Sequence, residues 1–222
     1  ASARSKGRQM PFAGTTLTVE ELTQQSFAGV DIALFSAGGP ISKKYAAAAV
    51  QAGAIVVDNS SAFRMDPSVP LVIPEINPQD VHQHKGIIAN PNCSTIIALV
   101  PLWPIYQVNP IRRLIASTYQ AASGAGAAAM EELRESTRAS LEGRPFEKKV
   151  LPHPYAFNVF SHNSKVNTDT LYNEEETKML NETRKIFHDA AIRISATCVR
   201  VPVLRAHCET LYFECTRPIT PA

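Results

Sequence analysis

The chain has 222 residues, of which 45% are hydrophobic and 19% are charged, and its formal net charge is +2 at pH 7. This composition is ordinary for a globular protein. The near balance of charge, without a dense basic run, argues against a nucleic-acid partner. No stretch of about 18 apolar residues predicts a membrane span. The four cysteines lack the spacing of a disulfide framework or a zinc site, which indicates a reducing compartment and no metal.

The first half of the chain predicts strand–turn–helix–strand units. Apolar runs at 30–35 and 54–58 predict strands, and the alanine-rich segment 41–52 predicts a helix between them. Strands that are apolar throughout indicate a parallel sheet covered on both faces. Ligands of such sheets bind at the carboxyl ends of the strands, where Ser36-Ala37-Gly38-Gly39 forms a turn of small residues. The same residues could simply make a tight turn, because glycine-rich turns are common.

A lone cysteine follows the next short strand, which is predicted at 86–89. Ser94-Thr95 is expected to cap a helix built on 96–100. Cys93 is then expected in the first turn, where unpaired amide groups and the positive end of the helix dipole stabilise a thiolate. A thiolate at that place is a nucleophile suited to covalent catalysis on a carbonyl. The alternative is a small buried hydrophobe.

The second half predicts a different architecture. A strand over 111–119 leads into a small-residue turn, and an amphipathic helix follows over 127–141. Beyond a polar stretch at 142–172, the segment 174–187 predicts a helix that opens with acidic residues and carries basic ones later, as the helix dipole favours. The alternating segments 192–199 and 210–216 predict antiparallel strands of a second sheet.

Four motifs, taken together and in order, resemble those of one family. They are Phe63-Arg64-Met65-Asp66 with 70–75, Asn90-Pro91-Asn92-Cys93-Ser94-Thr95, the segment 117–126, and Arg200-Val201-Pro202-Val203-Leu204-Arg205-Ala206-His207. Along essentially its whole length, the chain is similar to the aspartate-semialdehyde dehydrogenase family.

The resemblance implies an α/β fold in two parts. Residues 1–92 would form a partial NADP-binding domain with a Rossmann-like parallel sheet. Residues 93–222 would form a partial α+β catalytic and dimerisation domain with a largely antiparallel sheet. The family's glycine-rich pyrophosphate turn and a C-terminal portion have no counterpart in the sequence, so the resemblance implies a fragment that is inactive or very weak alone, while the full-length protein is active. It also implies a homodimer or homotetramer in the cytoplasm or the plastid stroma.

The resemblance also implies a reaction. The family reduces L-aspartyl-4-phosphate with NADPH to L-aspartate-4-semialdehyde and phosphate, in the biosynthesis of lysine, threonine and methionine. Cys93 corresponds to the nucleophile that forms a thioester, Asn92 to a neighbour that orients the reacting carbonyl, and His207 to the acid/base partner. From the residues alone, His207 could instead be held at a strand end by local hydrogen bonds. Arg200 and His207 are an odd number of residues apart, so Pro202 or a bulge should bend the segment to bring both to one side.

Five residues correspond to the family's substrate ligands. Arg200 corresponds to the arginine that binds the α-carboxylate through both oxygens, and Glu175 to the acid that receives the ammonium. Lys178 and Arg64 correspond to phosphate ligands, and Gln120 to a substrate-positioning amide. Glu175 and Lys178 lie three residues apart, hence on one face of a helix. The alternatives are a solvated helix start with an intrahelical ion pair and, for Arg64, a surface arginine.

The implied cofactor is NADP(H). Ser2-Ala3-Arg4-Ser5 corresponds to the loop that meets the adenosine 2′-phosphate. Two hydroxyls and a guanidinium suit a phosphate better than a free ribose hydroxyl, for which an acid is expected. Ser123-Gly124 corresponds to the small residues beside the nicotinamide, with Ser36-Ala37-Gly38 and Asn59 on neighbouring loops.

Two other interpretations stay open on the residues. Reductases of N-acetylglutamyl phosphate and phosphorylating glyceraldehyde-phosphate dehydrogenases share a cysteine–histidine mechanism, but Glu175 favours a substrate with a free amine. A non-catalytic relative could keep the fold. A scaffold, however, has no need of this set of residues together: Cys93, Gln120, Arg200 and His207.

Overall fold

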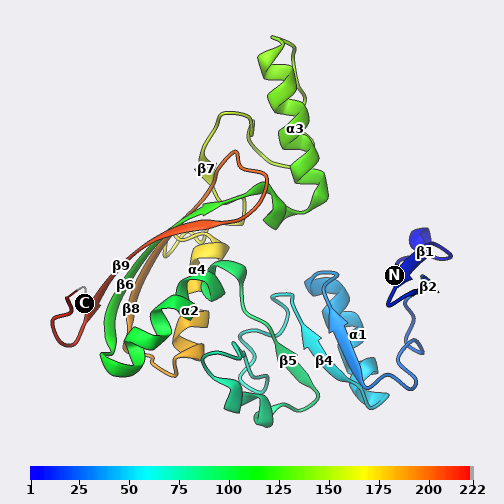
Figure 1. Cartoon of the computed structure of the whole chain (residues 1–222), viewed down its shortest axis with the longest axis horizontal. Helices are drawn as coiled ribbons and strands as arrows, with labels where there is room; N and C mark the ends of the chain where they lie inside the picture. The colour runs from blue at the N-terminus through cyan, green and yellow to red at the C-terminus, as the bar shows by residue number, and fades with distance from the viewer. Residues whose placement is uncertain (221–222) are drawn as a thin grey trace. The chain divides into compact units, whose positions relative to one another are not determined.

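The chain folds into two compact units, Ala1–Pro91 and Asn92–Ala222, in a computed structural model that describes residues 1–220 (Figure 1). The first unit contains a three-stranded parallel sheet in the order β3-β4-β5. Its elements are β3 (Ile32–Phe35), α1 (Gly39–Gln51), β4 (Ile55–Asp58) and β5 (Ile87–Ala89). The predicted α/β fold class and the parallel sheet are confirmed.

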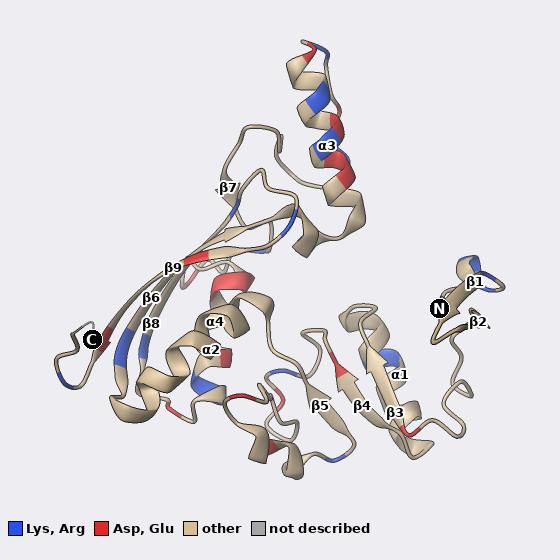
Figure 2. Ribbon diagram, viewed as in Figure 1, with Lys and Arg blue, Asp and Glu red and all other residues tan. Residues whose placement is uncertain are grey.

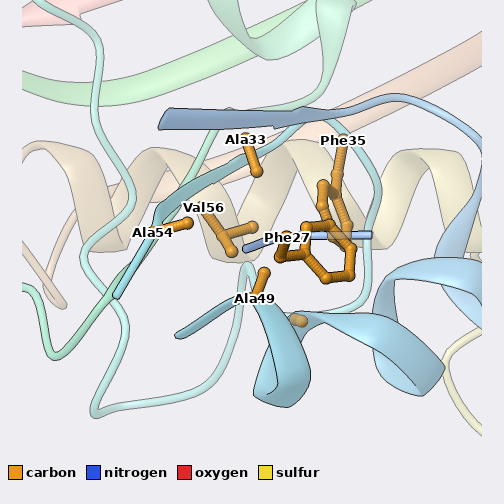
Figure 3. Close-up of a cluster of buried hydrophobic side chains, with 7 residues drawn as sticks. Phe27, Ala33, Phe35, Ala49, Ala54 and Val56 are labelled. Atoms are coloured by element: carbon orange, nitrogen blue, oxygen red, sulfur yellow. The ribbon is translucent and has the colours of Figure 1, made fainter. Parts of the chain in front are cut away.

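The helix α1 covers one face of this sheet. Phe35 and Val56 pack with Phe27 over the alanines of α1 (Figure 3). The rings of Phe27 and Phe35 stack with their centroids 5.8 Å apart. The predicted cover on both faces is wrong for the described residues, because Ile32 and Leu34 are 62% and 78% exposed. Side chains alternate along a strand, so these two residues mark the face of β3 that has no layer over it.

A β-hairpin precedes the sheet and is missing from the predicted elements. β1 (Gln9–Phe12) pairs antiparallel with β2 (Thr15–Thr18), and the turn residues Ala13 and Gly14 have φ values of 48° and 77°. Two positive φ values are typical of the mirror-image turns of tight hairpins. Every residue of both strands is exposed. A strand with no buried face needs no alternation of apolar and polar residues, so the sequence gives no periodic signal for this hairpin. The unit also contains the 3₁₀ helices η1 (Ala3–Ser5) and η2 (Pro78–Gln83).

The second unit is built on a four-stranded sheet in the order β7-β8-β6-β9. Its elements are α2 (Cys93–Val108), β6 (Ile111–Gln120), η3 (Ala122–Ala125), α3 (Ala127–Leu141), β7 (Phe160–Ser161), α4 (Glu174–Ile186), β8 (Arg193–Arg200) and β9 (Cys208–Cys215). Two of the three pairings are antiparallel, as expected, but β8 runs parallel to β6. The two predicted strands therefore flank β6 and do not pair with each other, because the loop 201–207 crosses the end of β6.

The helices α2 and α4 cover one face of this sheet. Ala98 and Met179 from the two helices pack against Ala116 of β6, while Ile115 and Tyr119, on the opposite face, are 42% and 40% exposed. In Figure 1, α3 extends away from the sheet, and Figure 2 shows charges of both signs along it.

The helix α2 continues well beyond its predicted length. It runs to Val108 through Pro101 and Pro104, although an interior proline costs a helix about 3 kcal/mol. Contacts with β6, β9 and α4 along this helix offset that cost.

Candidate active site

The candidate nucleophile lies at a capped helix end. Cys93 is the first residue of α2 and is exposed, which confirms its predicted place and makes the buried-hydrophobe alternative wrong. Asn92 is the N-cap, and its side-chain oxygen accepts hydrogen bonds from the backbone N–H groups of Ser94 (2.9 Å) and Thr95 (3.4 Å). The prediction that Ser94 and Thr95 cap the helix is therefore wrong, because a strong N-cap residue precedes them. The thiol lies at the positive end of the helix dipole.

Two buried side chains mark the carboxyl ends of the parallel strands β6 and β8. Gln120 and Arg200 are register partners, so their side chains leave the sheet on the same face, the one that α2 covers. They are 1% and 4% exposed. Gln120 Nε2 donates to Ser94 Oγ at 2.8 Å. Burial lowers the pKa of Arg200, whereas Tyr155, Glu175 and Cys93 act to raise it, which places the thiol within electrostatic reach of the guanidinium.

His207 reaches the same place from the crossing loop. β8 ends at Arg200 and His207 precedes β9, so the predicted bend is confirmed. The backbone N–H of Ala121 donates to His207 Nδ1 at 3.0 Å. A Cβ atom built on Gly124 would lie 2.8 Å from His207 Nε2 and 3.3 Å from Arg200 Nη1. Burial and the charge of Arg200 lower the pKa of His207, against the opposing charge of Glu175, so the ring is neutral at neutral pH.

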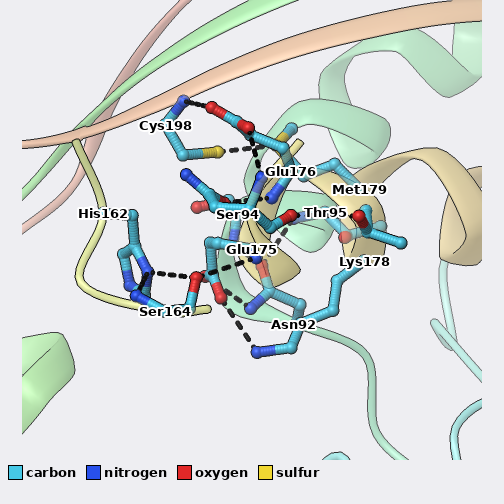
Figure 4. Close-up of polar contacts among 12 residues, drawn as sticks. Asn92, Ser94, Thr95, His162, Ser164, Glu175, Glu176, Lys178, Met179 and Cys198 are labelled. Carbon is cyan, nitrogen blue, oxygen red and sulfur yellow. Dashed lines mark hydrogen bonds and ion pairs between the residues drawn. The ribbon is translucent and has the colours of Figure 1, made fainter. Parts of the chain in front are cut away.

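Glu175 in the first turn of α4 joins several of these groups (Figure 4). Its Oε1 accepts hydrogen bonds from Asn92 Nδ2 at 2.8 Å and Gln120 Nε2 at 3.5 Å, and its Oε2 pairs with Lys178 Nζ at 3.0 Å. Burial acts to raise the pKa of this carboxyl, but Lys178, His162 and the Asn92 amide together hold it below its usual value. The intrahelical ion pair is present. A solvated helix start is wrong for Glu175, which is 4% exposed.

Two residues of the polar stretch hold Arg200 and escaped prediction. His162 Nε2 lies 2.9 Å from Arg200 Nη2, and Asn163 Oδ1 accepts a hydrogen bond from Arg200 Nε at 3.1 Å. The carbonyl oxygen of Ala121 accepts from Nη1 at 3.1 Å. These contacts depend on the pairing of the two-residue strand β7 with the end of β8. Such a short strand leaves no periodic signal in the sequence.

Glu182 is another residue of the candidate site that was not predicted, although the sequence contains a signal for it. Its Oε2 accepts a hydrogen bond from the backbone N–H of Asn92 at 2.6 Å. Glu182 follows Glu175 by seven residues and shares a helix face with it and with buried Met179. Acidic residues that recur on the apolar face of a predicted helix indicate buried polar contacts with a neighbouring element.

The first unit has a polar edge at the carboxyl ends of its strands. Ser36 follows β3, Asn59 follows β4 and Asn90 follows β5. Asn59 Nδ2 donates to Ser36 Oγ at 3.4 Å, and Asn90 Nδ2 donates to Asn59 Oδ1 at 2.7 Å. Arg64 donates to the carbonyl oxygens of Asn90 (2.9 Å) and Asn59 (3.0 Å). It is 7% exposed, so the surface-arginine alternative is wrong.

This edge has features that fit a dinucleotide. Gly38 is the N-cap of α1 with φ at 91°, and a Cβ atom built there would meet no heavy atom within 4 Å. A helix N-terminus behind an open glycine turn lets phosphate groups approach backbone N–H groups. Ser36 and Ala37 are exposed beside it. Ser2-Ala3-Arg4-Ser5 lies in and next to η1, and in residues 1–220 no side-chain hydrogen bond joins it to this edge.

Within the part of the chain that the structure describes, no group of three or more His, Cys, Asp or Glu residues could hold a metal ion. Over the same residues, none of the helices has both the length and the apolar character needed to cross a membrane.

Both units match models of semialdehyde dehydrogenases. Residues 1–84 match the NAD binding domain of this class, and residues 102–222 match its dimerisation domain. The chain is 53% identical over 218 residues to an aspartate-semialdehyde dehydrogenase of Synechocystis sp., and 52% identical over 225 residues to one of Aquifex aeolicus. A crystal structure of aspartate semialdehyde dehydrogenase II from Vibrio cholerae superposes with a TM-score of 0.95 at 44% identity. The chain belongs to the aspartate-semialdehyde dehydrogenase family.

The chain is shorter than these relatives. The alignments include 98% and 100% of the chain but 64% and 66% of the Synechocystis and Aquifex proteins. The Vibrio match covers 98% of this chain and 65% of that structure. A second structure of the Vibrio protein is complexed with ASA.

Proposed function

We propose that the complete gene product containing this chain is an NADP-dependent aspartate-semialdehyde dehydrogenase, which reduces L-aspartyl-4-phosphate to L-aspartate-4-semialdehyde and releases phosphate. The observation that carries the proposal is the exposed Cys93 thiol at the end of a helix whose N-cap, Asn92, is hydrogen-bonded to the buried Glu175, with the thiol within electrostatic reach of the buried Arg200. In this proposal, residues 1–92 belong to the NADP-binding domain and residues 93–222 to the catalytic and dimerisation domain. The product would feed the synthesis of lysine, threonine and methionine in the cytoplasm.

Cys93 supplies the nucleophile. Its thiolate attacks the acyl carbon of the phosphorylated substrate, a C–S bond forms, and phosphate leaves with the electron pair of the broken C–O bond. The resulting thioester stays electrophilic because sulfur donates weakly into the carbonyl. Bound NADPH supplies the hydride that this carbon accepts. The C–S bond of the reduced adduct then breaks, which releases the aldehyde and restores the thiolate.

His207 and Asn92 serve the reacting carbonyl. The Ala121 N–H occupies Nδ1 of His207, so the neutral ring carries its proton on Nε2 and can donate it to an oxygen that gains negative charge. Asn92 Nδ2 donates one hydrogen to Glu175 and has a second for the substrate carbonyl. Asn92 is thereby held by both the helix cap and Glu175.

Arg200 and Glu175 bind the charged ends of the amino-acid portion. The Arg200 guanidinium has more N–H groups than its three protein acceptors use, so it can still bind a carboxylate. Glu175, ionised at neutral pH, receives the ammonium. Lys178 and Arg64 bind phosphate, and the Gln120 amide positions the substrate.

The cofactor and the partner subunit complete the proposal. The polar edge of the first sheet, with Ser36-Ala37-Gly38 and Asn59, would hold the dinucleotide, while Ser2, Arg4 and Ser5 meet the 2′-phosphate. Ser123-Gly124 would lie beside the nicotinamide. The match of residues 102–222 to a dimerisation domain supports a homodimer or homotetramer.

The test is NADPH formation from aspartate semialdehyde, phosphate and NADP by the complete gene product. We expect Cys93→Ser to lower kcat by roughly 10³-fold or more. Cys208→Ser is the matched control, because Cys208 is the other exposed cysteine, and it should keep the wild-type rate.

Three outcomes would contradict the proposal. A wild-type turnover rate in Cys93→Ser would show that the reaction does not pass through a thioester on Cys93. A preference for N-acetylglutamate semialdehyde would indicate the related reductase class. No turnover by the wild type would indicate a non-catalytic relative that keeps the fold.

A further inference from the structure

A bridge of two side chains joins the buried Arg200 guanidinium to the backbone of Glu175. His162 Nε2 lies 2.9 Å from Arg200 Nη2, and His162 Nδ1 lies 3.0 Å from Ser164 Oγ. Ser164 Oγ also accepts a hydrogen bond from the backbone N–H of Glu175 at 3.2 Å (Figure 4). This His162–Ser164 bridge therefore runs from the Arg200 guanidinium to the helix turn that carries the Glu175 carboxylate.

The chemistry of the groups fixes the protons of the bridge. A guanidinium can only donate, so His162 Nε2 accepts from Arg200, and a neutral ring then carries its proton on Nδ1 and donates it to Ser164 Oγ at 3.0 Å. The backbone N–H of Ser164 lies farther from Nδ1, at 3.3 Å, and that contact is not a hydrogen bond in this tautomer because both groups are donors. Burial lowers the pKa of His162 to about 4; Glu175 opposes this shift, whereas Arg200, Lys178 and His207 add to it. The neutral ring is the form that can accept from Arg200, because an imidazolium would turn Nε2 into a second donor.

The loop that carries the bridge is tied down on both sides. β7 pairs with the end of β8, with Phe160 opposite Arg200. The backbone N–H of His162 donates to the carbonyl oxygen of Cys198 at 2.8 Å. On the other side, the Asn173 side chain, which caps α4, donates to Ser161 Oγ at 3.4 Å. The loop thus has fixed contacts with both elements whose charged side chains it connects.

We propose that the His162–Ser164 bridge sets the separation of Arg200 and Glu175, and that His162 is a positioning residue for selectivity toward substrates with adjacent carboxylate and ammonium groups. This inference rests on the proposed function. A substrate that contacts both charged groups needs them at one fixed distance, because small misplacements of binding groups are costly. A substrate without the amine needs only Arg200 and loses less when the bridge is broken.

The test compares His162→Leu and His162→Gln in the complete gene product. The substrates are aspartate semialdehyde and succinate semialdehyde, which has the same carbon chain without the amine, each with phosphate and NADP. We expect His162→Leu to raise the KM for aspartate semialdehyde about tenfold with a smaller change in kcat. Its kcat/KM preference for aspartate semialdehyde over succinate semialdehyde should fall by a similar factor. His162→Gln should restore both values, because its amide can accept from Arg200 and donate to Ser164.

His82→Leu is the control, since His82 is an exposed histidine in η2, outside the stretch that holds the bridge. Wild-type KM and selectivity in His162→Leu would overturn the inference and leave the proposed function standing. No turnover by the wild type would overturn both. If His162→Leu does not fold, Ser164→Ala breaks the bridge at its other end, and unchanged selectivity in that variant would overturn the inference.

Discussion

The missing side chain of Gly124 lets His207 and Arg200 lie against the end of β6. A Cβ atom there would be 2.8 Å from His207 Nε2, so Gly124→Ala must displace the imidazole. We predict that kcat of the proposed reaction falls by roughly 10²-fold, the cost of a small misplacement of a reacting group. The melting temperature should change little, because a histidine side chain can move aside. Steady-state kinetics and thermal unfolding together check this prediction, and a wild-type kcat would show that the position of His207 is unimportant.

Single residues of the candidate site differ in how far the sequence could predict them. Residue types and motifs indicated Cys93, Gln120 and Arg200, and the structure brings all three to one face of the second unit. The sequence gives little indication of the groups that hold these residues in place. His162 contacts Arg200 across 38 residues of sequence, and its local surroundings are polar and irregular. Side-chain networks between distant segments depend on tertiary packing, which local patterns do not encode.

At the scale of elements, one carboxylate holds the segment after α3 to that helix. Glu132 accepts hydrogen bonds from the backbone N–H groups of Lys149, Val150 and Leu151 at 2.5–3.0 Å. Burial acts to raise its pKa, but these N–H groups and Lys148 outweigh burial and hold the pKa below its usual value. A carboxyl with a lowered folded-state pKa stabilises the fold above its unfolded pKa, and this stabilisation is lost as the pH falls through the folded value.

Glu132→Gln should therefore release this segment. We expect the three amides to exchange hydrogen faster by an amount equivalent to about 1–3 kcal/mol of local stability, since the variant loses the charge and at least one acceptor. Glu131→Gln is the neighbouring control, because the Glu131 side chain is exposed and pairs with Arg134 on the helix surface. Hydrogen exchange near neutral pH checks the difference. Equal protection in both variants would contradict the role of Glu132. Acidification of the wild type through the lowered pKa of Glu132 should reproduce the loss.

The elements that the sequence predicts well are those with a strong period or an apolar run. The strands of both sheets other than β7, and the helices α1, α3 and α4, fall close to their predicted ranges. The hairpin β1–β2 was not predicted because none of its residues is buried. The helix α2 is longer than predicted because its packing outweighs the cost of the prolines at 101 and 104. The parallel pairing of β8 with β6 also escaped, because alternation within a strand specifies its buried face but not its neighbour.

At the scale of the whole molecule, the face of the second sheet opposite α2 and α4 has no cover in the described residues. Ile115 of β6 and Tyr212 of β9 are register partners on this face, and Tyr119 lies further along it. They are 42%, 56% and 40% exposed. An exposed sheet face with large apolar side chains is typical of a protein–protein interface, where tyrosine is enriched. We expect this face to form the subunit contact of the proposed homodimer.

Tyr212→Asp tests this contact, because it places a charge at the centre of the expected interface. A tyrosine there is a candidate hot spot, so the dimer dissociation constant should rise by about 30-fold or more. Leu141→Asp is the control: Leu141 is 75% exposed at the end of α3 and lies off this face, so that variant should keep the wild-type constant. Sedimentation velocity of the complete gene product over a concentration series measures both. Dissociation of the Leu141→Asp dimer but not of the Tyr212→Asp dimer would place the interface on α3, because a new charge changes the dissociation constant only where it lies inside the contact.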